Sequence, residues 1–166
     1  MTTQARKKSN TVWYIVAAII IIIIIVAGVV AYLYTRPPST SSSSPTVSVT
    51  LYAGSVNATA YGFGNTSSSI TSPGPSLTFK VGDKVTVTLH VVGTMSHNWA
   101  LVTQKVSGST SLAFPNAQIA SGSSPVLGGD TGSTTFTVTQ AGTYYYICQV
   151  DSHVALGMWG NVTVTS

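Results

Sequence analysis

The chain has 166 residues, which is enough for one domain and an accessory segment. Only 6% of them are charged, against about 25% in ordinary soluble domains, and the net charge of +4 comes from Arg6, Lys7, Lys8 and Arg36. After residue 36, three lysines balance three aspartates, so there is no basic patch and nucleic acid is excluded as a partner.

A long apolar segment stands near the N-terminus. Residues 11–35 contain no charge, and positions 19–25 are seven consecutive isoleucines. A helix over residues 13–34 is about 33 Å long, enough to cross a hydrocarbon core of about 30 Å. A cleaved signal peptide is the alternative, but its apolar region would have only about 7–15 residues and would end at a small-residue cleavage site. Residues 13–35 are therefore predicted to be a transmembrane anchor helix.

The residues that flank this helix predict its orientation. Three basic residues precede the helix and one follows it closely, so the positive-inside rule places residues 1–12 in the cytoplasm. Residues 36–45 are rich in serine and proline and have no apolar residues to bury, which indicates a short tether. The chain is thus predicted to cross the cell membrane once, with residues 46–166 on the extracytoplasmic side.

Apolar and polar residues alternate in many short runs between residues 46 and 166. The runs are rich in β-branched and aromatic residues and are separated by Gly, Pro, Ser and Asn, which is typical of an antiparallel sandwich or barrel. The predicted strands are 46–52, 58–65, 77–81, 84–92, 98–103, 133–139, 143–148 and 161–165. Residues 107–132 show no clear strand and are predicted to form a large excursion or a short helical turn. The predicted fold class is all-β with one N-terminal helix.

Residues with metal-binding chemistry gather near the C-terminus. Cys148 is the only cysteine, which excludes an internal disulfide, and His153 and Met158 follow it at steps of five residues in one predicted loop. Soft sulfur ligands with imidazole select copper, and two imidazoles, one thiolate and a weak axial thioether form the electron-transfer type of copper site. His97 supplies the second imidazole from a neighbouring strand end. One copper ion is therefore predicted to be bound by His97, Cys148, His153 and Met158.

The remaining reactive residues are not predicted to form a catalytic site. His90 lies inside a predicted strand without a partner at ligand spacing and is interpreted as structural, whereas Met95 is a competing thioether. The aspartates are isolated, and Asp151 is placed to fix the turn of the ligand loop or to orient partners. A nucleophilic pair of Cys148 and His153 lacks an oxyanion element and an orienting third residue. The chain is predicted not to be an enzyme.

The ligand motif resembles that of the blue copper proteins, the cupredoxins. The spacing Cys-x₄-His-x₄-Met after an aromatic strand is similar to that of the rusticyanins and more similar still to that of the sulfocyanins, the membrane-anchored respiratory cupredoxins of archaea. The resemblance is carried by Ser96-His-Asn-Trp99, Tyr144-Tyr-Tyr-Ile-Cys148 and Gly157-Met-Trp-Gly-Asn161. It extends to the order of anchor, tether and single β-domain.

This resemblance implies a Greek-key β-sandwich or barrel with one type 1 copper, held by His97, Cys148 and His153 with Met158 axial. It also implies that Asn98 ties the two ligand segments together. Gln149 stands where sulfocyanins are expected to have a proline.

The predicted function is the shuttling of single electrons in a respiratory chain, without a small-molecule substrate. The predicted partners are cytochromes or terminal oxidase components, which would meet an apolar surface around the edge of His153, formed by Val154, Ala155, Leu156 and Trp159. A copper-free, membrane-tethered adhesion module and a copper chaperone are the alternatives. The binuclear copper domain of a terminal oxidase is excluded, because it needs two bridging cysteines and the chain has one.

Overall fold

The computed structural model describes residues 11–35 and 45–166, so residues 1–10 of the predicted tail 1–12 and residues 36–44 of the predicted tether 36–45 lie outside the described part. The chain divides into two compact units, Met1–Ser42 and Ser43–Ser166. The first unit contains helix α1, Thr11–Thr35. Within it, Trp13–Tyr32 is long and apolar enough to cross a membrane, a property that a signal sequence near the N-terminus would share.

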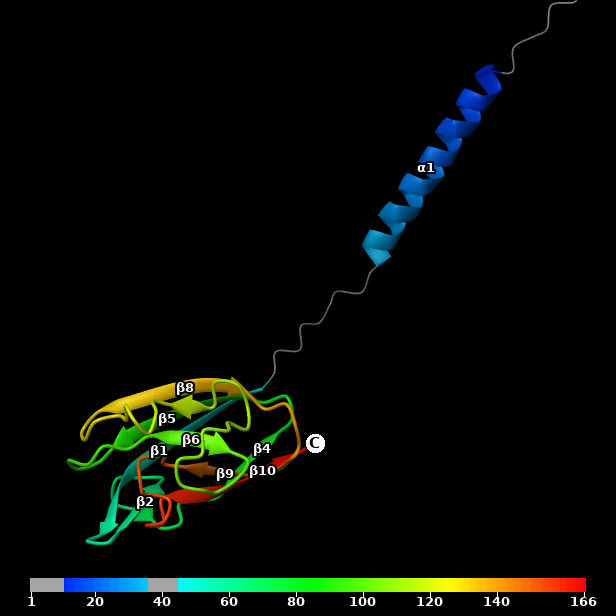
Figure 1. Ribbon diagram of the computed structural model, residues 1–166. Coiled ribbons are helices and arrows are strands. Elements are labelled where there is room, and N and C mark those ends of the chain that lie inside the picture. The colour runs from blue at the N-terminus through cyan, green and yellow to red at the C-terminus, as the bar shows by residue number, and fades with distance from the viewer. Residues whose placement is uncertain (1–10, 36–44) are drawn as a thin grey trace, which may run out of the picture. The chain divides into compact units, whose positions relative to one another are not determined.

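The second unit consists of two five-stranded sheets (Figure 1). The first sheet contains, in spatial order, β3 (Ile70–Thr71), β2 (Ala60–Gly64), β1 (Thr46–Asn57), β5 (Lys84–Val91) and β8 (Thr131–Thr137). The second contains β4 (Leu77–Lys80), β10 (Trp159–Thr165), β9 (Gly142–Ile147), β6 (Trp99–Val102) and β7 (Gln118–Ile119). The prediction of an all-β, two-sheet domain after an apolar helix is confirmed.

The period-two pattern of the sequence explains how the two sheets pack. Strand β5 buries every second side chain, because alternate residues of a strand point to opposite faces. The buried set of β5 is Val85, Val87, Leu89 and Val91. Opposite it, the second sheet contributes large buried side chains, among them Phe79, Trp99, Tyr146 and Val162, to the same cluster. Each fully buried side chain of this size stabilises the fold by about 1.5–3 kcal/mol.

The expectation of a purely antiparallel sandwich was wrong at two places. Strands β1 and β5 pair in parallel from Thr46 with Lys84 to Ala53 with Val91, and β4 and β10 also pair in parallel. The alternation of apolar and polar residues is the same in both kinds of pair, so the pattern carries no information on strand direction. In both pairs the two partners are separated by other strands along the sequence, which allows the chain to return in the same direction.

The segment 107–132 is an excursion that packs on the second sheet through β7 and then reaches the first sheet, where residues 129–132 bond to the end of β5. It contains β7, turns and, at its end, the first two residues of β8, and within these fully described residues no helix. The stretch before β7 folds back onto β6, where the Leu101 N–H donates to the Ala117 carbonyl at 2.9 Å and the Ala113 N–H donates to the Leu101 carbonyl at 2.8 Å. This cover explains why all four residues of β6 are buried, although a strand with one exposed face would bury only half.

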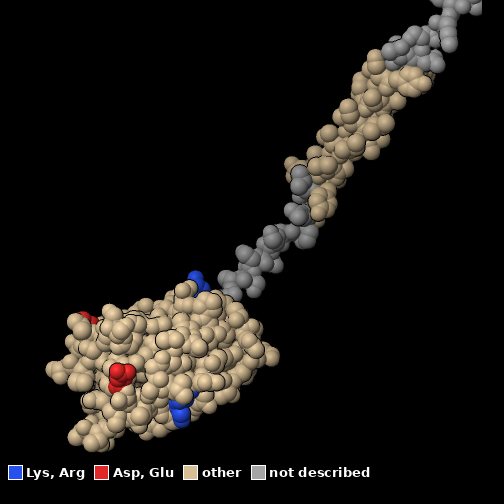
Figure 2. All heavy atoms as spheres, viewed as in Figure 1, with Lys and Arg blue, Asp and Glu red and all other residues tan. Residues whose placement is uncertain are grey.

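Charged side chains are sparse on the second unit. Figure 2 shows one face, on which the few lysines and aspartates lie apart from one another. Lys105 lies over an aromatic ring, with its Nζ 3.3 Å from the ring centroid of Trp159. The surface of this unit is therefore close to neutral and mostly uncharged.

Candidate metal centre

The four predicted ligands lie where three adjacent strands of the second sheet end. Strand β9 is antiparallel to both of its neighbours, and Ile147 at its end pairs with Ala100 of β6 and with Trp159 of β10. His97 therefore lies just before β6, Cys148 just after β9 and Met158 just before β10. The sheet thus brings residues 97 and 148 together although they are far apart in the sequence.

Backbone hydrogen bonds close the loop that carries three of the four residues. The Cys148 N–H donates to the Met158 carbonyl at 3.1 Å, and the Met158 N–H donates to the His153 carbonyl at 2.9 Å. Gly157 has a φ of +92°, and a Cβ at this position would overlap the Ser72 hydroxyl. Only glycine fits this turn without strain or displacement, so the loop shape is fixed by both bonding and packing.

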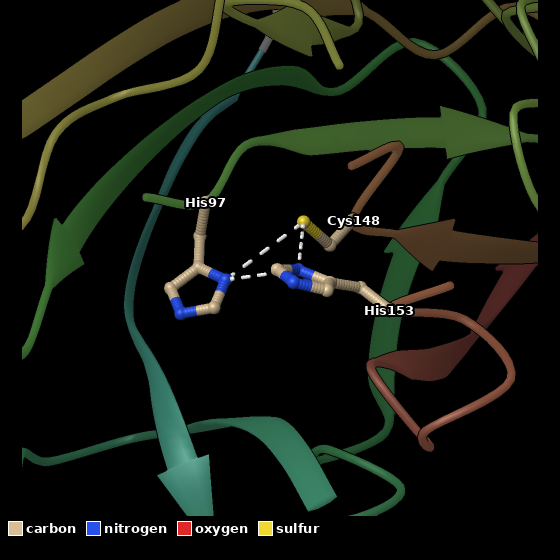
Figure 3. Close-up of side chains that lie close together, drawn as sticks. All are labelled: His97, Cys148 and His153. Atoms are coloured by element: carbon tan, nitrogen blue, oxygen red, sulfur yellow. Dashed lines mark hydrogen bonds between the residues drawn. The ribbon is translucent and has the colours of Figure 1, made fainter. Parts of the chain in front are cut away.

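The donor atoms of three side chains converge on one point (Figure 3). The Nδ1 atoms of His97 and His153 are 3.2 Å apart. The Sγ of Cys148 lies 3.4 Å from Nδ1 of His153 and 4.0 Å from Nδ1 of His97. All three residues are buried, and they form one candidate metal group within the described part of the chain.

The size of this triangle fits a small ion bound by two nitrogens and one thiolate. Bonds of about 2.0 Å to nitrogen and about 2.3 Å to sulfur, at trigonal angles, require separations of roughly 3.5 Å between nitrogens and 3.7 Å between nitrogen and sulfur. The observed separation between the two nitrogens, 3.2 Å, is slightly shorter than required, and the two separations between nitrogen and sulfur, 3.4 and 4.0 Å, lie on either side of the required value. Because the donors are two imidazoles and a thiolate, the set matches the trigonal plane of an electron-transfer copper site.

The two nearby methionines differ in their burial. Met158 is fully buried, and its backbone is bonded to the backbone of both Cys148 and His153. Met95, the competing thioether, is 45% exposed. The buried methionine of the ligand loop is thus the better placed of the two to complete the centre.

Burial also controls the protonation of the three donors in the metal-free chain. Desolvation, followed by the electrostatic effect of His153, lowers the pKa of His97 to about 4. Desolvation also lowers the pKa of His153. The pKa of Cys148 rises to about 11 because its thiol is desolvated, although backbone N–H groups of Asn98 and Val150 act in the opposite direction. At neutral pH the two imidazoles are therefore free to bind a metal, whereas the thiol must first lose a proton.

Asn98 connects the two ligand segments, as the family resemblance implied. Its backbone N–H donates to Sγ of Cys148 at 3.4 Å. Its side-chain Oδ1 accepts from the backbone N–H of Gln149 at 2.6 Å. The residue after the first histidine is therefore bonded to the cysteine and to the residue that follows the cysteine.

Tyr61 of β2 is a neighbour of the centre that was missed from the sequence. Its ring centroid lies 4.5 Å from that of His153 and 5.5 Å from that of His97. The strand that contains Tyr61 was predicted, but the alternation in that strand does not indicate which part of the other sheet it approaches. The tyrosine ring therefore packs against both imidazoles.

The other residues considered from the sequence lie outside the cluster. His90 on β5 stacks on Tyr52, with ring centroids 4.9 Å apart, and its Nδ1 is 2.8 Å from the Thr131 hydroxyl. These contacts agree with its interpretation as a structural histidine. Asp151 is exposed within the ligand loop, and the part of the chain that the structure describes shows no hydrogen bond to its carboxylate.

A protein-family comparison identifies the second unit. The family model described as copper binding proteins of the plastocyanin/azurin family matches residues 64–165. This range includes all four predicted ligands, and their arrangement is that of a type 1 copper site. A comparison with curated protein sequences finds no match.

Solved structures of copper proteins share the fold. A multi-copper oxidase from Pseudomonas thermotolerans matches with a TM-score of 0.56 and 20% identity over 74% of this chain and 30% of its own. Copper nitrite reductase from Nitrosomonas europaea matches at 0.54 and 25% over 72% and 41% of the two chains. Auracyanin B matches at 0.50 and 22% over 74% and 91%. The chain thus spans less than half of the two enzymes but most of auracyanin B.

Proposed function

The chain belongs to the plastocyanin/azurin family of copper-binding proteins, and on that basis we propose that it is a membrane-anchored blue copper protein of the sulfocyanin kind that carries single electrons in a respiratory chain. Plastocyanin and azurin are electron carriers rather than enzymes. His97, Cys148 and His153 would hold the copper, and Met158 would be its axial ligand. Bound copper would accept and release one electron at a time.

The observation that carries the proposal is the convergence of one thiol sulfur and two imidazole nitrogens inside the described unit. Their separations of 3.2, 3.4 and 4.0 Å already approach those needed around a metal. An arrangement of ligands that is formed before binding changes little between oxidation states. Such rigidity favours electron transfer over chemistry at the metal.

Burial distinguishes an electron carrier from a copper chaperone. Cys148 and His97 have no exposed surface, and His153 is only 5% exposed. Handing over a metal requires an incoming ligand to reach it, whereas an electron can leave through the edge of a buried imidazole. The adhesion alternative gives no reason for a thiol and two imidazoles to meet in the interior.

The surface beside His153 supports brief docking to redox partners. Val154 lies at the edge of the buried set, and Leu156 is 38% exposed. The unit from residue 46 onward has equal numbers of lysines and aspartates. The exposed Ala155 and Leu156 offer a small apolar surface, with the exposed Asp151 in the same loop. Small interfaces suit the short-lived contacts of redox partners. Cytochromes or terminal oxidase components are the partners that we propose.

The N-terminal part of the chain supports the proposed location. Helix α1 is long and apolar enough to span a bilayer, and residues 6–8 are basic whereas only Arg36 follows it closely. The proposal is that the helix stays attached, with its N-terminus in the cytoplasm and the copper unit outside. Fractionation of cells that express the full chain tests this: the protein should remain with membranes in alkaline carbonate and dissolve in detergent. Release of a shortened, soluble product would identify the helix as a cleaved signal sequence.

The electron-carrier proposal is tested by the visible and EPR spectra of the protein loaded with Cu(II). We expect an intense blue or green thiolate-to-copper band that disappears on reduction and is absent from the Cys148→Ser variant. His90→Gln is the matched control, because His90 is a histidine outside the cluster, and this variant should keep the band. Copper bound without the band would favour a chaperone, and a chain that binds no copper would leave the adhesion module.

A further inference from the structure

Gln149 joins the metal centre to the excursion (residues 107–132) by hydrogen bonds of its buried side chain. The residue is only 7% exposed. Its Oε1 accepts from Asn98 Nδ2 at 2.7 Å and from Gln118 Nε2 at 3.1 Å. Its Nε2 donates to the Ser109 carbonyl at 2.6 Å. One amide side chain therefore contacts three segments of the chain.

The orientation of each amide in this group follows from its neighbour. The backbone N–H of Gln149 must donate, so the side chain of Asn98 presents its oxygen there and turns its NH₂ towards Gln149 Oε1. Gln149 then has both acceptor positions of Oε1 filled and directs its NH₂ to the Ser109 carbonyl. Exchanging the oxygen and nitrogen of either amide would bring donors against donors. Asn98, Gln149 and Gln118 thus form an amide chain with one consistent pattern of bonds.

The excursion also packs directly on the backbone of Gln149. A Cβ on Gly122 would overlap the Gln149 carbonyl, so this part of the excursion approaches as closely as glycine permits. Gln118 belongs to β7, the short edge strand that pairs with β6. The amide chain is therefore held by two independent contacts with the excursion, one through side chains and one through backbone.

We propose that Gln149 is a positioning residue of the copper centre, which fixes Asn98 so that the Asn98 N–H points at the Cys148 sulfur. Asn98 is the only residue of the amide chain that donates to this sulfur, at 3.4 Å. A hydrogen bond to a ligand sulfur stabilises the electron-rich thiolate of the reduced site, so it raises the reduction potential. Through Gln149, the packing of the excursion controls this bond. The redox part of the inference rests on the proposed function, and the part that concerns the metal-free chain does not.

The test uses the full chain in detergent and the substitution Gln149→Leu, which keeps the volume of the side chain and removes its hydrogen bonds. In the metal-free protein, hydrogen exchange at the Asn98 amide should become faster by about fivefold, the effect of losing one typical hydrogen bond. In the copper-loaded protein the reduction potential should fall. Gln140→Leu is the matched control, since Gln140 is an exposed glutamine outside the amide chain, and it should change neither quantity.

A second variant, Gln118→Leu, tests the same role of the amide chain. Gln118→Leu removes the outer bond of the amide chain together with the bond from Gln118 Nε2 to the Ala120 carbonyl, and it leaves the bonds of Gln149 to Asn98 and Ser109 in place. It should therefore shift both quantities in the same direction by a smaller amount, and it replaces Gln149→Leu if that variant does not fold. A folded variant in which the Asn98 exchange rate and the potential both equal those of the unsubstituted protein would overturn the inference. If no blue copper spectrum is obtained at all, the proposed function fails, while the exchange experiment still decides the role of Gln149.

Discussion

The metal-free protein is expected to lose stability as the pH falls from 7 to 4, because two neutral imidazoles are buried side by side. Burial, and then the neighbouring His153, lower the pKa of His97 from 6.5 to about 4. In the unfolded chain the same imidazole titrates near its ordinary pKa of about 6.5. Between these two values the unfolded state binds more protons than the folded state, so the free energy of unfolding decreases as the pH falls.

The magnitude follows from the difference between the two pKa values. One pKa unit corresponds to about 1.4 kcal/mol. For a pKa that is about 4 in the folded state, the loss relative to pH 7 is about 2 kcal/mol at pH 5 and about 3 kcal/mol at pH 4. The lowered pKa of His153 adds to the loss in the same direction. With a urea dependence of about 2 kcal/mol per molar, the unfolding midpoint should fall by roughly 1.5 M.

Urea unfolding of the metal-free Ser43–Ser166 unit at pH 7, 6, 5 and 4 measures this loss. All described strands and core residues belong to this unit, which makes it suitable for the measurement. The variant His97→Gln, which has no imidazole at this position, should show a clearly shallower dependence on pH. Equal slopes for the two proteins would refute the assignment to His97, and a midpoint that does not change between pH 7 and pH 4 would refute the burial of neutral imidazoles.

Three further predictions concern the thiol and the aromatic residues. Binding of Cu(II) at pH 7 should release about one proton per chain, because burial raises the pKa of the Cys148 thiol to about 11. Titration calorimetry in buffers of different ionisation enthalpy measures the number of protons released, and a value of zero would contradict the prediction. Tyr146→Phe should lower the free energy of unfolding by about 1 kcal/mol and the melting temperature by roughly 4 °C, because the buried phenol donates to the Pro75 carbonyl at 2.6 Å. An unchanged melting temperature in calorimetry would show that this bond contributes nothing to stability. Tyr61→Leu should alter the EPR parameters of the copper-loaded protein, since this ring packs on both ligand imidazoles. Tyr52→Leu is the control: it removes a ring stacked on a histidine outside the cluster and should leave the EPR parameters unchanged.

The features predicted well from the sequence are those that depend on local pattern. Strand β5 was predicted because its alternation directly reports one buried and one exposed face. The ligand loop was recognised because a thiol, an imidazole and a thioether are rare residues that share one short segment. Burial and donor chemistry are properties of single residues and their near neighbours. They can therefore be inferred before any tertiary contact is known.

The features that were missed depend on contacts between distant segments. The two-residue strands β3 and β7 are too short to show a period, and the directions of the β1–β5 and β4–β10 pairs depend on how the chain connects them. Tyr61 approaches the ligands only because β2 lies across from their loop. Gln149 was noted as an unexpected residue, but its four hydrogen bonds reach partners up to 51 positions away. No local pattern predicts such partners.

The position of the ligands at three strand ends connects acid stability with metal binding. The chain has three aspartates and no glutamate, so few carboxylates are present whose protonation would unfold it in acid. The two buried imidazoles then become the main groups that favour unfolding as the pH falls. A metal held by the two imidazoles would compete with these protons and would stabilise only the folded state. We therefore expect that bound copper makes this protein more resistant to unfolding in acid, and that loss of copper makes it less resistant.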